Sequence, residues 1–176
     1  GAAITGGEVE IRDFPLRDLE VPLAFLKESG VRYFVGDEAL IVRPGACYPV
    51  EIATGPYPGI NSDMQPLFAA FGAMSPGESR IVDLRFPGRY AYAEELRKMG
   101  VDASVSGDVL QIRGGRRLRG ADVTALDLRA GITLTLAGLV ADGVTRIDDA
   151  WQVERGYDAF VPKIRALGGQ VEALEV

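Results

Sequence analysis

Two long stretches of this chain are apolar almost without interruption, whereas most other segments alternate apolar and polar residues. The stretches run from Met64 to Met74 and from Leu128 to Ala141, and each has the length of a helix rather than of a strand. The second contains Ala130, Gly131 and Gly138, which leave helix faces small enough for close contact with neighbours. We therefore predict two helices that are buried in the core.

A helix end, a glycine and an alternating strand recur along the chain, and the strand often leads through a turn into a second strand. Gly30, Gly100 and Gly168 each follow a last helical turn, where a residue that tolerates positive φ closes the helix at little cost. The Gly-Asp dipeptides at 36–37 and 107–108 then predict hairpins between two alternating strands. The three copies cover residues 26–45, 96–115 and 164–176.

Further strands rich in β-branched residues are predicted before and after the apolar helices. They cover residues 49–54, 79–84, 122–127 and 144–149. The resulting order is strand, helix, strand, helix, strand, strand, used about twice in full and once in part. Such a chain buries its helices and lays small sheets around them, so we predict an α+β fold in a single domain. The three repeat units cover approximately residues 1–45, 46–115 and 116–176 of the 176-residue chain.

Charge and hydropathy limit the classes of partner. The net charge is −6, from 19 basic and 25 acidic residues, which argues against general affinity for nucleic acid or anionic lipid. A single basic cluster is interrupted by glycines and is typical of a solvated loop. Its members are Arg113, Arg116, Arg117 and Arg119. No apolar run reaches the ~20 residues of a membrane span, and the first residues do not resemble a signal peptide, so we expect a cytoplasmic protein.

The chain has one cysteine and no histidine. This excludes an internal disulfide, a zinc site built from cysteines and an imidazole base. Cys47 lies in a loop-like stretch without a partner base, so we interpret it as a small apolar side chain rather than a nucleophile. No metal site and no cofactor are expected.

The start of the first apolar helix contains an acid beside a predicted cap. Ser62 and Gln65 have the spacing of a capping box, and Pro66 falls in the first turn, where proline is tolerated. Asp63 then lies at the positive end of the helix. An acid at this place either complements the helix dipole or belongs to a site.

The start of the second apolar helix has an arginine where a cation opposes the dipole. Asp127 is the predicted cap, and we expect something anionic to compensate Arg129. Arg89 and Arg155 each follow a predicted strand end and precede a helix, at equivalent places in the repeat. A single surface arginine is usually only solvated, but this set would converge on one end of the fold. The pattern predicts a small polyanion site with an acid nearby for proton transfer.

Four motifs, PYPGINSDMQ, GRYAYAEELRKMG, DLRAGITLTLAGL and ERGYDAFVPKIRALGG, follow one another in this order. In sequence and spacing they resemble the C-terminal half of the enolpyruvyl transferases, in particular those that act on UDP-N-acetylglucosamine. The resemblance extends over nearly the whole chain. It implies the fold called an inside-out α/β barrel, in which each of two domains contains three repeat units.

The resemblance implies transfer of the enolpyruvyl group of phosphoenolpyruvate to the 3'-hydroxyl of the UDP-sugar, at the start of peptidoglycan precursor synthesis. Asp63 would take the hydroxyl proton and contact the acceptor. Arg89, Arg129 and Arg155 would surround the phosphate and carboxylate of phosphoenolpyruvate, and Asp127 would help to organise them. These roles agree with the need of such an addition for fixed cations and a nearby base.

The resemblance also implies a partner. In the family the site lies between two domains, and this chain matches one, so we expect the N-terminal half of the same enzyme as partner. Part of a preorganised site stabilises a transition state poorly, so the isolated chain is expected to be inactive. Cys47 does not match the reactive loop cysteine of the family.

Two other functions stay open. Arg85 stands where the family usually has an apolar residue near the acceptor sugar, and Asn61 changes the loop before the first apolar helix. These differences favour another nucleotide or a shikimate-type ring as acceptor. A non-catalytic module of the same fold is the second alternative, and it predicts that Asp63, Arg129 and Arg155 can be replaced without loss of function.

Overall fold

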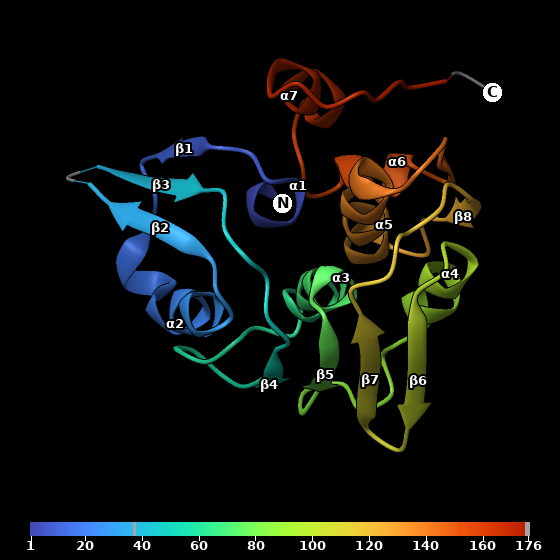
Figure 1. The fold of residues 1–176 in the computed structure, drawn as a ribbon, viewed down its shortest axis with the longest axis horizontal. Coiled ribbons are helices and arrows are strands. Elements are labelled where there is room, and N and C mark those ends of the chain that lie inside the picture. Colours follow the sequence, from blue (N-terminus) through green and yellow to red (C-terminus); the bar gives the residue numbers. More distant parts are fainter. Residues whose placement is uncertain (37, 175–176) are drawn as a thin grey trace.

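The computed structural model describes residues 1–36 and 38–174. Within them the two apolar segments form the helices α3 (Gln65–Met74) and α5 (Leu128–Val140). The two helices pack against each other at the centre of the molecule (Figure 1). Ala69 of α3 and Leu134 of α5 are completely shielded from solvent. The prediction of two buried helices is confirmed, and with sheets around them the α+β class is confirmed as well.

The N-terminal part of the chain forms a three-stranded antiparallel sheet, to the left of these helices in Figure 1. Its strands are β1 (Val9–Arg12), β2 (Arg32–Val35) and β3 (Ala39–Arg43). β3 is central, and Val42 lies opposite both Val9 and Tyr33. Helix α2 (Glu20–Glu28) precedes β2, and the short helix α1 (Ala2–Thr5) contacts β3 and α5.

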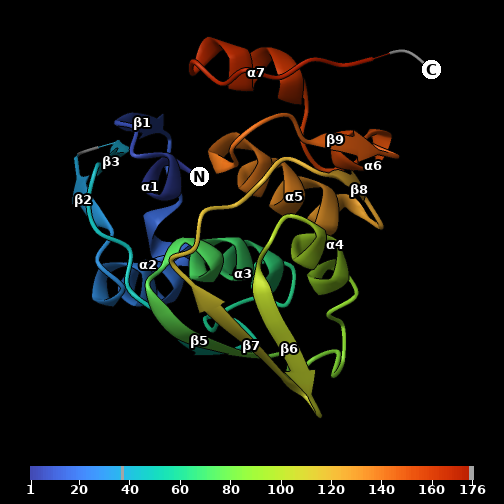
Figure 2. The ribbon, with the colours of Figure 1, turned by 45° about the vertical axis from the view of Figure 1, so that its right-hand side comes forward.

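A four-stranded sheet, in the order β4-β5-β7-β6, packs one face against α3 (Figure 2). Its strands are β4 (Glu51–Ala53), β5 (Gly77–Val82), β6 (Asp102–Ser106) and β7 (Val109–Gly114). β4 runs parallel to β5, and the other pairs are antiparallel. Side chains alternate between the two faces of a strand, so Ser79 and Ile81 of β5 point inward together with Leu110 and Ile112 of β7.

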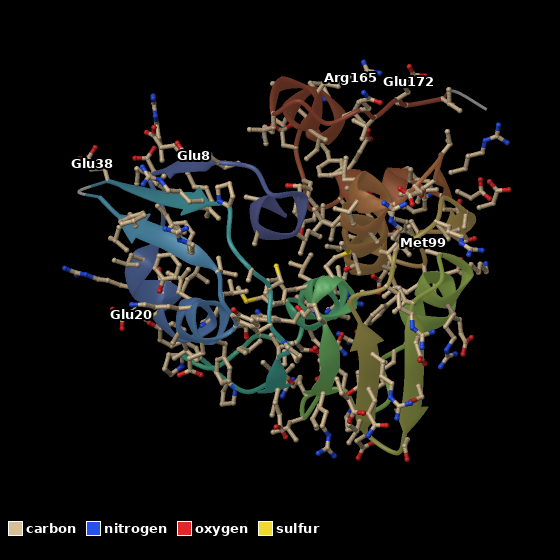
Figure 3. All side chains as sticks on the ribbon, in the orientation of Figure 1. Glu8, Glu20, Glu38, Met99, Arg165 and Glu172 are labelled. Carbon is tan, nitrogen blue, oxygen red and sulfur yellow. The ribbon has the colours of Figure 1, made fainter. Side chains whose placement is uncertain are left out.

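The C-terminal third contains a parallel pair, β8 (Asp122–Thr124) and β9 (Arg146–Asp148), joined through α5. Helix α4 (Tyr92–Lys98) contacts β6 and β8, and α6 (Trp151–Glu154) packs on α5. Helix α7 (Phe160–Ala166) has no buried residue. Figure 3 shows the side chains of Glu20 and Glu38 at the periphery and Met99, which is fully buried, on the inner side of α4.

The glycines predicted to close helices do so. Gly30, Gly100 and Gly168 have φ angles of 89°, 92° and 91°. The second hairpin is also confirmed, with Gly107 at φ 58° between β6 and β7. β2 and β3 pair as predicted, whereas Asp37 of their turn lies outside the described residues.

The third copy of the repeat is shorter than predicted. No strand follows Gly168 in residues 169–174, and the carbonyl of Val171 instead accepts a hydrogen bond from Nε of Arg165 at 2.6 Å. None of the described strands pairs with residues 169–174. The order strand, helix, strand, helix, strand, strand occurs in full once among the described elements, from β4 to β7. The second full copy is therefore not present in the described residues, and the last two residues of the expected strand, 175–176, lie outside them.

The basic cluster is on the surface, but it is not purely a loop, because Arg113 belongs to β7. Its side chain and those of Arg116 and Arg117 pair with acids at 3.1–3.5 Å. Cys47 is half-buried, and burial raises the pKa of its thiol, which disfavours the nucleophilic thiolate. None of the helices in the described residues has the length and hydropathy to cross a membrane.

Candidate active site

Three segments from different parts of the chain bring charged side chains together. They are the loop before α3, the loop of residues 83–91 between β5 and α4, and the first turn of α5. Nη1 of Arg129 donates a hydrogen bond to Oδ1 of Asp63 at 2.9 Å, and Nη1 of Arg89 lies 3.8 Å from the same oxygen. One carboxylate thus lies next to two guanidinium groups from segments distant in sequence.

Asp127 holds the start of α5 and one of these cations. Its Oδ1 accepts hydrogen bonds from the backbone N–H groups of Arg129 and Ala130 at 2.9 and 2.8 Å, which confirms the predicted cap. Its Oδ2 accepts from Nη2 of Arg129. Burial alone would raise the pKa of Asp127, but its hydrogen bonds outweigh that effect and lower the pKa, so the carboxylate stays ionised.

The anionic compensation expected at Arg129 is therefore present as Asp127 and Asp63. The hydrogen bond that Arg129 donates to Asp127 is the main cause that raises the pKa of Arg129. The Arg129 side chain is 19% exposed, which keeps it well fixed, whereas Asp63 is 65% exposed. Arg129 is thus the largely buried part of the cluster, and the carboxylate of Asp63 is its solvent-exposed part.

Arg89 has unused hydrogen-bonding capacity. Its guanidinium lies over the ring of Phe86 at 3.4 Å. Its Nη1 is buried, yet it has no hydrogen-bond partner among the described residues. A buried N–H without an acceptor is costly, so an incoming anion would find a prepared donor here.

The predicted capping box at α3 is wrong. The cap residue of α3 is Met64, and the hydroxyl of Ser62 donates to Oδ2 of Asp83 at 2.5 Å. The side chain of Gln65 accepts from the Tyr92 hydroxyl at 2.5 Å instead of reaching back to the helix start. Both polar groups are buried, and neither satisfies an N–H group at the start of α3.

Arg155 is not part of the direct contacts. It follows helix α6 rather than a strand, is exposed, and donates from Nη1 to Oε1 of Gln152 at 2.9 Å. Its neighbour Tyr157 does approach the cluster. The pKa of Tyr157 is raised by burial and further by the negative charge of Asp63.

Arg85 is exposed and lies in the same loop as Arg89, on the ring of the same phenylalanine. Its guanidinium carbon is 5.7 Å from the ring centre of Phe86. Asn61 is also exposed, and its side-chain oxygen accepts from the backbone N–H of Asp63 at 2.7 Å. Both residues with a predicted effect on acceptor choice therefore flank the charged cluster.

Sequence reasoning missed Asp83. It is completely buried at the end of β5 and bonds to both loops of the site. The available signal was a charged residue directly after the apolar strand RIV and before a proline-glycine loop. Two of its partners, Thr54 and Ser62, are 29 and 21 residues away in sequence, and no local pattern indicates them.

Residues 1–164 match the family described as EPSP synthase (3-phosphoshikimate 1-carboxyvinyltransferase). The chain belongs to this family. It is 39% identical over 172 residues to the UDP-N-acetylglucosamine 1-carboxyvinyltransferase of Halorhodospira halophila. It is 42% identical over 173 residues to the protein of the same name from Desulfofundulus thermocisternus. The chain is covered to 97% in both matches, but it spans 41% of the first relative and 70% of the second.

Solved structures agree. The enolpyruvyl transferase NikO from Streptomyces tendae superposes with a TM-score of 0.86 at 29% identity, over 96% of this chain and 42% of that protein. EPSP synthase from Acinetobacter baumannii superposes with a TM-score of 0.72 at 18% identity, which supports the fold alone. The predicted enolpyruvyl transferase fold is confirmed by these neighbours.

Proposed function

We propose that this chain is one domain of a transferase that moves the enolpyruvyl group of phosphoenolpyruvate to the 3'-hydroxyl of UDP-N-acetylglucosamine. The main support is the convergence of Arg89 and Arg129 on the exposed carboxylate of Asp63, from three separate segments. The two relatives above bear the name of this activity and match nearly the whole chain.

In this proposal the arginines bind the anionic groups of phosphoenolpyruvate. Arg129 is held by Asp127, and Arg89 is held over Phe86 with one buried N–H group unpartnered. Fixed cations need no reorganisation when charge develops, and a planar guanidinium suits both phosphate and carboxylate. Arg155 lies outside these contacts and would have to turn from Gln152 toward the ligand.

Asp63 is the proton acceptor of the reaction. The hydroxyl proton of the sugar passes to this carboxylate while the oxygen bonds to C2 of phosphoenolpyruvate and C3 takes up a proton. Loss of phosphate from C2 and of a proton from C3 restores the double bond. The neighbouring arginines, both next to Oδ1 of Asp63, would orient the carboxylate that accepts the proton.

The complete site would need residues beyond this chain, which spans 41% of the length of the Halorhodospira halophila relative. The N-terminal half of the same enzyme is the proposed partner, and the chain alone is proposed to be inactive because its cluster is open to water. Peptidoglycan precursor synthesis in the cytoplasm is the process that fits this activity.

The test is phosphate release from phosphoenolpyruvate in the presence of UDP-N-acetylglucosamine. We expect release when this chain is combined with the N-terminal half of the Halorhodospira halophila relative, and none from the chain alone. In the combination, Asp63→Asn should lower the turnover number by about 10²–10⁴-fold. Asp142→Asn removes an exposed acid that pairs with Arg117 outside the site and serves as the matched control. Full turnover with Asp63→Asn would contradict the proposal, and it would favour a non-catalytic module.

A second candidate acceptor is another nucleotide or a shikimate-type ring. It is favoured by Arg85, an exposed cation on the ring that also supports Arg89. We would compare the acceptors UDP-N-acetylglucosamine, other nucleotide sugars and 3-phosphoshikimate for the wild type and for Arg85→Val. If Arg85 selects the acceptor, the ranking changes, whereas an identical ranking excludes this role.

A further inference from the structure

One buried carboxylate outside the charged cluster bonds to both loops that form it. Asp83 is completely shielded from solvent and accepts four hydrogen bonds. Its Oδ1 accepts from the hydroxyl of Thr54 at 2.9 Å and from the backbone N–H groups of Arg85 and Phe86 at 3.0 Å each. Its Oδ2 accepts from the hydroxyl of Ser62 at 2.5 Å. Every partner lies in a loop or at a strand end rather than in the core sheet.

These bonds lead directly to two residues of the site. Ser62 is the neighbour of Asp63 in the chain, so its hydrogen bond fixes the backbone from which Asp63 projects. Phe86 supports the guanidinium of Arg89, with 3.4 Å between the guanidinium carbon and the ring centre. The relative position of Asp63 and Arg89, whose charged atoms are 3.8 Å apart, thus depends on a single shared acceptor.

Asp83 is itself held from the opposite side. Its backbone N–H donates to the hydroxyl of Tyr90 at 2.8 Å, and that hydroxyl lies 2.7 Å from the carbonyl oxygen of Asp108. The hydroxyl of Thr54 also accepts from the N–H of Leu84 at 3.0 Å. The anchor therefore connects β4, β5 and the β6–β7 turn to the site loops, and it is rigid because each polar group is used.

The protonation state of Asp83 suits this role. Burial alone would raise its pKa, but the four hydrogen bonds outweigh the burial and lower the pKa below the ordinary value for aspartate. The group is therefore ionised at neutral pH, and hydrogen bonds to an ionised acceptor are about twice as strong as neutral ones.

We propose that Asp83 is a positioning residue, which sets the spacing between Asp63 and Arg89 through its bonds to Ser62 and to the backbone of residues 85–86. The kinetic part of this inference rests on the proposed function, while its geometric part does not. A displacement of about 1 Å in a reacting group can cost about 10²-fold in rate, so a buried anchor of this kind affects turnover although it touches no substrate.

Ser62→Ala is the most selective variant, because it removes only the connection to the loop of Asp63. Its matched control is Ser79→Ala. Ser79 is a completely buried serine of β5 whose hydroxyl accepts from the N–H of Val50 at 3.1 Å, away from the site. Each variant loses one buried hydrogen bond, and Ser62→Ala should lose the more stability because its acceptor is charged. Asp83→Asn is the third variant, since it keeps the volume and one oxygen but removes the charge.

In the two-half enzyme we expect Ser62→Ala and Asp83→Asn to lower the turnover number at least tenfold, with a smaller change in the KM for phosphoenolpyruvate. Ser79→Ala should stay within twofold of the wild type. Equal kinetic losses in all three variants would mean that stability alone is measured, and unchanged kinetics in Ser62→Ala would equally overturn the positioning role.

A second measurement separates this inference from the proposed function. We would record hydrogen exchange of the Arg85 and Phe86 amides and the nitrogen NMR signal of the Arg89 guanidinium, without any substrate. Asp83→Asn should speed amide exchange about tenfold, and both site variants should shift the guanidinium signal, unlike Ser79→Ala. If the wild type proves inactive with every acceptor, the proposed function fails, and these signals alone then decide the geometric role of Asp83.

Discussion

At the scale of single residues, Asp127 combines a helix cap with an ion pair, and the two contributions can be separated. Asp127→Ala removes the acceptor of two backbone N–H groups at the start of α5 and should cost about 0.5–2 kcal/mol of unfolding free energy. Asp127→Asn keeps a capping oxygen but loses the charge that holds Arg129, so it should be clearly less destabilising. Urea unfolding measures both values, and an equal loss in the two variants would show that the ion pair rather than the cap stabilises the helix.

The lowered pKa of Asp83 predicts how stability depends on pH. A group whose pKa is lower in the folded state stabilises the fold above its unfolded pKa, about 3.9 for aspartate, and this contribution disappears as the pH falls through the folded value. The stability difference between the wild type and Asp83→Asn should therefore be largest at pH 5–7 and shrink below pH 4. Urea unfolding at pH 7, 4.5 and 3 tests this. Ser79→Ala, which adds or removes no titratable group, should give a difference that does not change with pH.

Some residues of the site could be predicted from the sequence, and others could not. Asp127 and Arg129 were predictable because capping and dipole effects act within one helical turn. An anion beside Arg129 was predicted, but its identity as Asp63 came only from the structure. The role of Asp83 was not predictable, because its bonds from Thr54 and Ser62 join residues 29 and 21 positions apart.

At the scale of elements, the close approach of β7 to α3 depends on a missing side chain. A Cβ atom at Gly114 would lie 2.0 Å from the carbonyl oxygen of Gly72 and 2.5 Å from that of Ser75. Backbone atoms cannot move aside as a side-chain tip can, so Gly114→Ala should cost more than about 2 kcal/mol and loosen the sheet from the helix. Gly55→Ala is the control, since no atom lies within 4 Å of its added Cβ. Thermal unfolding of both variants gives the comparison, and a Gly114→Ala protein as stable as the control would contradict the tight packing.

The elements themselves were largely predictable, for reasons that differ between helices and strands. Runs of apolar residues predicted α3 and α5. Glycines after the last helical turn predicted the ends of α2, α4 and α7, and they have positive φ in the structure. The predicted strand after Gly168 failed because alternation alone does not supply a neighbouring strand to pair with. The start of α3 was misjudged because the spacing of Ser62 and Gln65 does not indicate their distant partners, Asp83 and Tyr92.

At the scale of the whole molecule, the charged cluster is bordered by apolar side chains that are exposed to solvent. Leu84 is 65% exposed in the loop of Arg89, and Leu126 is 46% exposed beside Asp127. Neither contributes to the core, and each is next in sequence to a site residue, Arg85 or Asp127, so under the proposed function we expect them to meet the other half of the enzyme. We therefore expect Leu84→Ser and Leu126→Ser to weaken association of this chain with the N-terminal half by about tenfold each, as measured by titration calorimetry, because each loses about 1–2 kcal/mol of apolar burial. Val144→Ser is the control, since Val144 is 79% exposed beyond the opposite end of α5. An equal effect at all three positions would mean that general hydrophobicity, rather than a defined interface around Asp63 and Arg129, drives the association.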